Sequence, residues 1–294
     1  QDPQSGDIEH VRDADRVMRV RRFEGEVYAA SKTGLFRSRD GGTSWTDLGV
    51  PRTEVYSVAV SPDGGRLYAG THPAHLYASD DGGETWRELD GLQEVPSREQ
   101  WHTPRHRDEA HVRSLGVHSG AADRVVAGVE VGGVHVSDDR GESWAERRDG
   151  LQDDVHHVLV CGPEEYVASC GDGLYRTRDA GRSWTRLDED LSRSYFREAL
   201  LHDGLLYAAA ARSPPGTWRG DSGADAALFV SDDGGDSFRE VTYPGEPREV
   251  VLAWAVVDDT VVAGTNEGRL LVEETDGWAT CGQIPSSIRS LCIA

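Results

Sequence analysis

Lysine is almost absent from this chain of 294 residues, since Lys32 is the only one and arginine supplies the other basic side chains. Lys and Arg together number 31 against 52 Asp and Glu, which gives a formal net charge of −21 at pH 7. A nucleic-acid-binding domain usually carries a basic stripe or patch, and no such stripe runs along this sequence. We therefore expect no nucleic acid partner.

Long apolar runs are missing as well, and no stretch approaches the ~20 residues that a membrane-spanning helix needs. We therefore expect no membrane partner. The four cysteines match neither a zinc spacing nor a redox motif, so we interpret Cys161, Cys170, Cys281 and Cys292 as small buried hydrophobic residues. The chain begins at Gln1 instead of Met, which indicates a trimmed start. We expect a cytoplasmic protein, with secretion after loss of a signal peptide as the alternative.

What the chain does contain is a repeated eight-residue phrase. It reads SRDGGTSW at 38–45, SDDGGETW at 79–86, SDDRGESW at 137–144, TRDAGRSW at 177–184 and SDDGGDSF at 231–238, and a decayed copy, EETDGW, follows at 273–278. The central aspartates are Asp40, Asp81, Asp139, Asp179 and Asp233, at spacings of 41, 58, 40 and 54 residues. A basic period of about 40 residues with four short apolar segments is typical of a β-propeller blade.

The phrase resembles the Asp box, or bacterial neuraminidase repeat, of sialidases, sortilin-type receptors and photosystem-assembly propellers. The resemblance covers nearly the whole chain and implies a β-propeller fold. In each box we expect the aspartate to accept hydrogen bonds from amides of its own turn, while glycine supplies the positive φ angles. The acidic excess with a single lysine also resembles salt-adapted proteins of halophilic archaea, whose charges are screened at ~1 M salt, where the Debye length is about 3 Å.

The repeats predict an all-β protein, with residues 1–294 forming one β-propeller of six four-stranded blades. Blade 2 shows the pattern: VYSVAVS, RLYAGT, HLYASD and TWREL read as its strands A to D, from the innermost to the outermost. The final stretch, IRSLCIA, reads as one more A strand that closes the ring. A seventh blade completed by residues 1–16 is the alternative.

Propeller geometry places the boxes in the C–D turns on one face, so the D–A and B–C loops open on the opposite face. Two insertions fall in those loops, at 90–110 between blades 2 and 3 and at 212–226 within blade 5. Loops of more than a dozen residues in a compact domain are usually functional or disordered. We therefore predict a ligand site on this face.

The residues expected on this face are rich in Arg, His and Trp. Alignment of the A-strand starts puts Tyr56, Arg113, His156, Arg197 and Arg289 at matching positions near the mouth of the central channel. The neighbouring loops and strand ends add His72, His111, Glu130, Trp101, Trp218 and Arg219. Guanidinium groups bind carboxylates bidentately, so Arg113, Arg197 and Arg289 are a candidate anion-binding triad.

The sialidase resemblance implies a glycoside hydrolase that holds a carboxylate with three arginines and uses a tyrosine activated by a glutamate. On that basis Glu130, His156 and Tyr56 are the candidate catalytic residues. Arg113, Arg197, Arg289, His111, His72, Trp101 and Trp218 are the candidate ligand-binding residues. The segment MRVRRFEG at 18–25 departs from the sialidase arginine–hydrophobe–proline motif, which leaves the activity open. We predict a pocket for a small polar or anionic, sugar-like ligand, and any enzyme here as a hydrolase of the glycosidase or lactonase type.

Two other functions stay open. His72, His111, His156 and Glu130 would hold a divalent metal cofactor in a gluconolactonase-like hydrolase, because imidazole and carboxylate suit zinc, manganese or iron. A non-catalytic scaffold that binds a protein partner is the other, since the fold alone does not define function. We favour the anion over the metal because Arg113 lies two residues from His111 on one expected strand.

Overall fold

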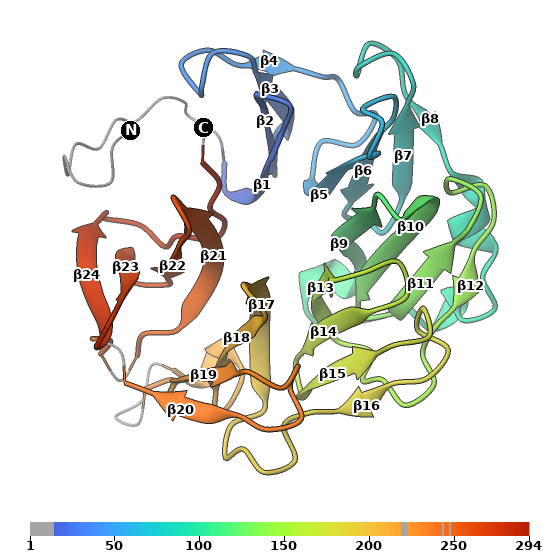
Figure 1. The fold of residues 1–294 in the computed structure, drawn as a ribbon. Coiled ribbons are helices and arrows are strands. Elements are labelled where there is room, and N and C mark those ends of the chain that lie inside the picture. The colour runs from blue at the N-terminus through green and yellow to red at the C-terminus, as the bar shows by residue number, and fades with distance from the viewer. Residues whose placement is uncertain (1–14, 219–222, 243, 247, 294) are drawn as a thin grey trace.

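The computed structural model describes residues 15–218, 223–242, 244–246 and 248–293, and it is a ring of six four-stranded antiparallel sheets (Figure 1). In every sheet the strands pair in sequence order, so the first strand of each blade lies next to the central channel and the last lies at the rim. The prediction of an all-β propeller with six blades is confirmed. No helix in the described part of the chain has the length and apolar character that crossing a membrane requires.

Each blade is one run of four strands. In chain order these are β1 (Val17–Phe23), β2 (Glu26–Ser31), β3 (Gly34–Ser38) and β4 (Thr46–Asp47); β5 (Val55–Val60), β6 (Leu67–Thr71), β7 (Leu76–Ser79) and β8 (Arg87–Glu88); β9 (His111–His118), β10 (Ala121–Glu130), β11 (Gly133–Ser137) and β12 (Ala145–Glu146); β13 (Val155–Val160), β14 (Tyr166–Cys170), β15 (Gly173–Thr177) and β16 (Thr185–Arg186); β17 (Tyr195–His202), β18 (Leu205–Ala211), β19 (Ala227–Ser231) and β20 (Arg239–Val241); β21 (Val251–Val257), β22 (Thr260–Thr265), β23 (Arg269–Glu274) and β24 (Gly277–Gln283).

The box residues form the turns between the third and fourth strands. In blade 1 the Ser44 amide donates to Asp40 Oδ1 at 2.8 Å, and the Ser44 hydroxyl donates to Asp40 Oδ2 at 2.6 Å. The Gly42 amide donates to Ser38 Oγ at 2.8 Å, with Gly42 at φ 94°. The same aspartate contacts recur for Asp81 with Thr85, Asp139 with Ser143, Asp179 with Ser183 and Asp233 with Ser237. The predicted hydrogen bonding of the box aspartates is confirmed.

The core lies between blades, because each sheet is apolar on both faces. One cluster joins blades 1 and 2 through residues such as Leu35, Leu48, Val58 and Tyr77. Related clusters join blades 2 and 3, 3 and 4, 4 and 5, and 5 and 6. Trp86 of the second box also crosses an interface, since its Nε1–H donates to Leu48 O at 2.7 Å.

The C-terminal segment closes the ring between blades 6 and 1. Residues 284–293 form no strand, which differs from the expected A strand, yet the Ile288 amide donates to Thr265 O at 2.9 Å and the Val20 amide donates to Ser290 Oγ at 3.0 Å. Ile288 packs so closely on Gly264 that an added Cβ would lie 2.3 Å from it. Val112 stands in the same relation to Gly70 in blade 2, at 2.6 Å. The segment therefore occupies the place of a further innermost strand.

The innermost strands share an irregularity that aims side chains into the channel. In β1, β5, β13 and β21 a single residue is skipped by the pairing with the next strand: Met18, Tyr56, His156 and Leu252. In β9 Arg113 is skipped in the same way, and Val117 is skipped at a second irregularity. In β17 the pairing skips Arg197 and Glu198. A bulge of this kind leaves its extra residue unpaired and turns the side chain in a new direction.

The box turns give a first prediction, on stability. Asp179→Ala removes the acceptor of the Ser183 amide, at 2.9 Å, and hydroxyl, at 2.7 Å. Because the turn is partly solvated, we expect the free energy of unfolding to fall by about 1 kcal/mol. Urea unfolding measures this loss, and Asp190→Ala, at an exposed loop aspartate, is the control that should change nothing. Equal losses in both variants would contradict an architectural role.

The same turn gives a prediction on pH. The amide and hydroxyl of Ser183, with Thr177, lower the pKa of Asp179 to about 2, against ~3.9 for an unfolded aspartate. A depressed pKa stabilises the folded state above the unfolded pKa, and that contribution disappears as the pH falls through the folded value. The stability difference between the native chain and Asp179→Asn should therefore be full above about pH 4 and shrink toward pH 2. A difference that is constant with pH would be inconsistent with this pairing.

Candidate functional site

The bulged residues line one cavity at the central channel. Its walls are Met18, Arg19, Tyr56, Arg113, His156, Arg197, Glu198, Leu252 and Arg289, and its empty volume, including the open mouth, is about 420 Å³. The structure thus brings together all five residues that the sequence alignment put at matching positions. Arg289 joins them from the C-terminal segment, one residue after Ile288, as Arg113 follows Val112.

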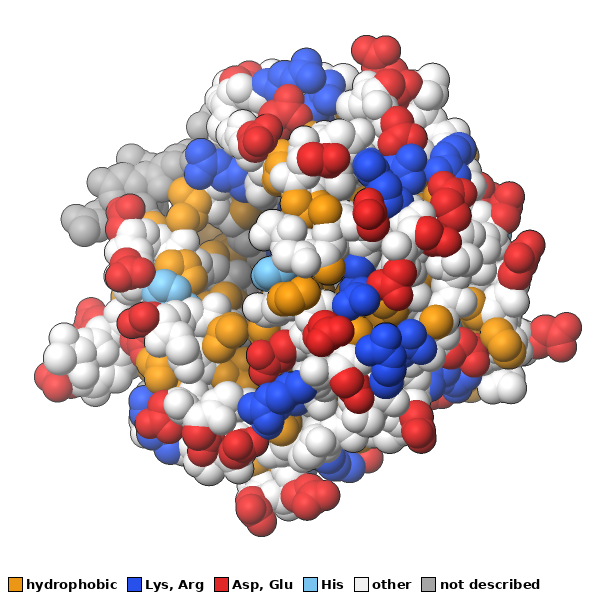
Figure 2. All heavy atoms as spheres, turned by 45° about the vertical axis from the view of Figure 1, so that its right-hand side comes forward, with side chains coloured by type: hydrophobic (Ala, Val, Ile, Leu, Met, Phe, Trp, Pro, Cys, Tyr) orange, Lys and Arg blue, Asp and Glu red, His pale blue; other side chains and the backbone are white. Residues whose placement is uncertain are grey.

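The cavity is strongly basic for an acidic protein. Four arginines line it against a single carboxylate, that of Glu198. On the face shown in Figure 2, by contrast, acidic side chains are spread widely with basic ones among them. Arg19 reaches from blade 1 to Glu198 of blade 5, with Nη1 at 2.7 Å from Oε1, so one of the four charges is neutralised.

Glu130 lies behind the cavity wall and neutralises Arg113. Its side chain is 3% exposed, and it forms an ion pair with Arg113, with His111 Nε2 at 3.4 Å and His106 Nε2 at 3.6 Å from its oxygens. Burial alone would raise the pKa of Glu130, but Arg113, His106 and His111 hold it well below its usual range. Glu130 is therefore a charged partner of Arg113.

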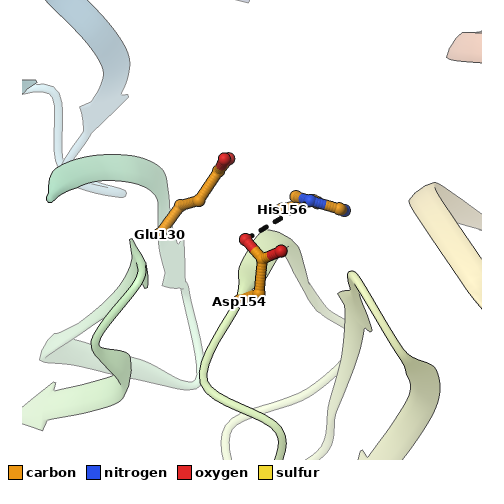
Figure 3. A group of neighbouring side chains, drawn as sticks. All are labelled: Glu130, Asp154 and His156. Carbon is orange, nitrogen blue, oxygen red and sulfur yellow. Dashed lines mark ion pairs between the residues drawn. The ribbon is translucent and has the colours of Figure 1, made fainter. Parts of the chain in front are cut away.

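His156 faces a second carboxylate that the sequence reasoning missed. Its Nε2 lies 3.6 Å from Oδ1 of Asp154, and the imidazole is 1% exposed on its side chain. Ligand atoms of Glu130, Asp154 and His156 all lie within 4.8 Å of one another (Figure 3). This contact could have been expected from the sequence, because Asp154 comes two residues before His156 in the loop that leads into β13.

Four residues were expected to hold a metal: His72, His111, His156 and Glu130. Among the described residues, only His156 and Glu130 of these belong to the group of neighbouring ligand atoms that includes Asp154. His72 has both ring nitrogens engaged, since Nε2 lies 2.9 Å from His106 O and Nδ1 lies 2.6 Å from Arg107 Nη2. His111 is fully buried against the Tyr56 ring, at a centroid distance of 4.4 Å, and burial lowers its pKa to about 4. Neither joins the group around Asp154.

The two tryptophans of the insertions lie in the core instead of the cavity. Trp101 is 1% exposed and packs on His135, and its Nε1–H donates to Ser97 Oγ at 3.0 Å. Trp218 is 9% exposed and its Nε1–H donates to Ser213 O at 2.7 Å. Neither ring is among the residues that line the cavity, which differs from the expectation that both contact the ligand. Arg219, the other residue expected from this insertion, lies outside the described residues.

Tyr56 and Glu130 do not form the tyrosine–glutamate pair of a sialidase. Glu130 pairs with Arg113, whereas the Tyr56 ring packs at a tilt against His111 and lines the cavity. Burial raises the pKa of Tyr56, and the charges of Glu54 and Glu130 add to that effect. A raised pKa keeps the phenol protonated and makes it a poor nucleophile.

The Arg113–Glu130 pair generates a prediction for stability. Glu130→Gln leaves the Arg113 guanidinium buried without its partner, and we expect a loss of about 3 kcal/mol in the free energy of unfolding. The double variant with Arg113→Met removes both charges and should lose less than the sum of the single variants. Chemical denaturation of the four proteins measures the coupling, and additive losses would show that the pair is not an energetic unit.

The sequence is similar to one family model and to two curated relatives. A family model described as the BNR/Asp-box repeat matches residues 77–88, which hold the second box. A xyloglucanase from Hypocrea jecorina (strain QM6a) is 39% identical over 75 residues, covering 24% of this chain and 9% of the relative. A xyloglucanase from Paenibacillus sp. is 26% identical over 274 residues, covering 87% of this chain and 24% of the relative. The chain thus spans less than a quarter of the length of these curated relatives.

Solved structures show the same fold at low identity. An ancestral GH74 enzyme matches with a TM-score of 0.69 at 18% identity, covering 90% of this chain and 38% of that one. The GH74 xyloglucanase of Xanthomonas campestris matches at 0.68 and 19%, covering 91% and 45%. YCF48 bound to a D1 peptide matches at 0.61 and 17%, covering 91% and 82%. The chain is a six-bladed β-propeller that carries BNR/Asp-box repeats and is similar in fold to the propellers of GH74 enzymes.

Proposed function

We propose that this propeller binds a small anionic ligand, such as an acidic sugar, at the arginine-lined mouth of its channel. The observation that carries the proposal is the charge of the cavity, where four arginines meet one glutamate in a chain of net charge −21. A concave site lined by one sign of charge attracts and concentrates ligands of the opposite sign. Guanidinium groups suit carboxylate and phosphate oxygens in particular.

Two of these arginines retain binding capacity. Among the residues that the structure describes, Arg197 and Arg289 have no carboxylate within ion-pair distance, and Arg197 Nη1 donates to the Tyr195 hydroxyl at 2.9 Å. Burial lowers the pKa of Arg289, and the charges of Arg16 and Arg113 lower it further. A partly buried cation crowded by other cations is costly, so a bound anion would relieve that cost.

Carbohydrate is the ligand class that the relatives favour, since both curated relatives are named xyloglucanases. Hydrolysis of a glycoside requires a carboxylic acid of raised pKa as well as a second carboxylate. The cavity does not supply that acid in Glu130, whose pKa is held well below its usual range. The geometry therefore favours binding of an anion over glycoside hydrolysis at this cavity.

Calorimetric titration with D-glucuronate, and with neutral D-glucose as the matched control ligand, tests the proposal. We expect glucuronate to bind and glucose not to bind, with the affinity falling as sodium chloride is added, because chloride competes and screens the charges. Equal binding of the two sugars, or no binding of glucuronate, would overturn the proposal.

A variant pair assigns the binding to the cavity. Arg289→Gln should weaken glucuronate binding by about 1–3 kcal/mol, since it removes one charge-assisted hydrogen bond. Arg22→Gln, at an exposed arginine of β1, is the matched control and should bind as the native chain does. If both variants bind equally well, the anion does not bind at the arginines of the channel.

A further inference from the structure

A backbone contact determines which ring nitrogen of His156 carries a proton. His156 Nδ1 lies 2.5 Å from Phe196 O, and a carbonyl oxygen only accepts hydrogen bonds, so Nδ1 carries the proton. A neutral imidazole that carries its proton on Nδ1 has a lone pair on its other ring nitrogen. The remaining nitrogen, Nε2, therefore presents a lone pair.

That lone pair faces another acceptor. Nε2 of His156 lies 3.6 Å from Oδ1 of Asp154. Both atoms are buried, and neither has a hydrogen-bond partner among the described residues. Two buried acceptors side by side are unfavourable unless a cation or a proton donor lies between them.

Glu130 supplies a third ligand atom at the same point, and arginines hold both carboxylates in place. Arg105 Nη2 donates to Asp154 Oδ2 at 3.1 Å, which leaves Oδ1 free, and Arg113 pairs with Oε2 of Glu130. The other oxygen of Glu130, Oε1, has His106 Nε2 at 3.6 Å. The side chain of Asp154 is also closely packed here, because a Cβ added at Gly171 would lie 2.3 Å from Asp154 Oδ2.

We propose that Glu130, Asp154 and His156 form a binding site for one divalent transition-metal ion. Figure 3 shows the three side chains converging from blades 3 and 4, with ligand atoms within 4.8 Å of one another. One imidazole and two carboxylates suit Mn²⁺ or Zn²⁺. Three protein ligands would leave a coordination position for water or a ligand atom, and one of the three, His156, lines the cavity. The two arginine contacts reduce the negative charge of the site, so we expect moderate affinity.

Titration of the metal-free protein with Mn²⁺, followed by the electron paramagnetic resonance signal of the free ion, tests the proposal. We expect one Mn²⁺ to bind per chain, with zinc competing for the same site. No binding, or binding of many ions with no saturation at one, would overturn the proposal.

Ligand variants locate the ion. Asp154→Asn keeps the shape of the side chain but removes its charge, and His156→Ala removes the imidazole; each should weaken Mn²⁺ binding by at least about tenfold. Asp172→Asn, at an exposed aspartate of the same blade, is the matched control and should bind normally. Should His156→Ala fail to fold, Asp154→Asn decides alone. Native affinity in Asp154→Asn would overturn the assignment.

The metal and anion sites are separable in the same experiment. Arg289 is not among the three ligands, so Arg289→Gln should retain Mn²⁺ binding even where it loses glucuronate binding. Loss of Mn²⁺ binding in Arg289→Gln together with full binding in Asp154→Asn would show that the ion lies elsewhere in the channel and would overturn the assignment.

Discussion

The packing of one blade on the next is the constraint on which the rest of this structure depends. Each sheet is apolar on both faces, so a blade is stable only between two neighbours, and the chain must close into a ring. The box turns support this packing at the rim, where Trp86 of blade 2 donates to a backbone oxygen of blade 1. At the last interface Ile288 fills the place over Gly264 that Val112 fills over Gly70. Closure therefore combines this side-chain fit with single hydrogen bonds, such as those of the Ile288 and Val20 amides, and does not use a paired strand.

Ring closure also decides which side chains meet. Residues that are tens to hundreds of positions apart are brought around one axis, and the recurrent irregularity turns one or two side chains of each inner strand toward it. The repeat thus fixes the positions, while the residue type at each position is free to vary. Met18 and Leu252 occupy two of these positions and arginine or histidine occupies others, so the lining is chemically uneven. Six similar blades therefore enclose a cavity whose sides differ in chemistry.

The charges around the axis fall into two groups. Arg19 and Arg113 are neutralised by Glu198 and Glu130, and these pairs tie blade 1 to blade 5 and the first strand of blade 3 to its own second strand. Arg197 and Arg289 have no such carboxylate among the described residues. The paired arginines stabilise the wall of the channel, and the unpaired ones give it a basic character. That division is the physical basis for proposing an anion there, while the neighbouring acceptors Asp154 and His156 favour a cation at the wall.

The sequence by itself determined the blades, the box turns and the inner positions, because each depends on local spacing. The five aligned residues from Tyr56 to Arg289 were found in this way, although Arg289 lies in a segment that is not a strand. The side-chain partners required the tertiary structure: Glu130 bonds to Arg113 instead of Tyr56, Trp101 and Trp218 pack in the core, and Asp154 faces His156. The reason is that alternation and repeat length report which side of a strand a residue occupies, but not which other side chain it meets there.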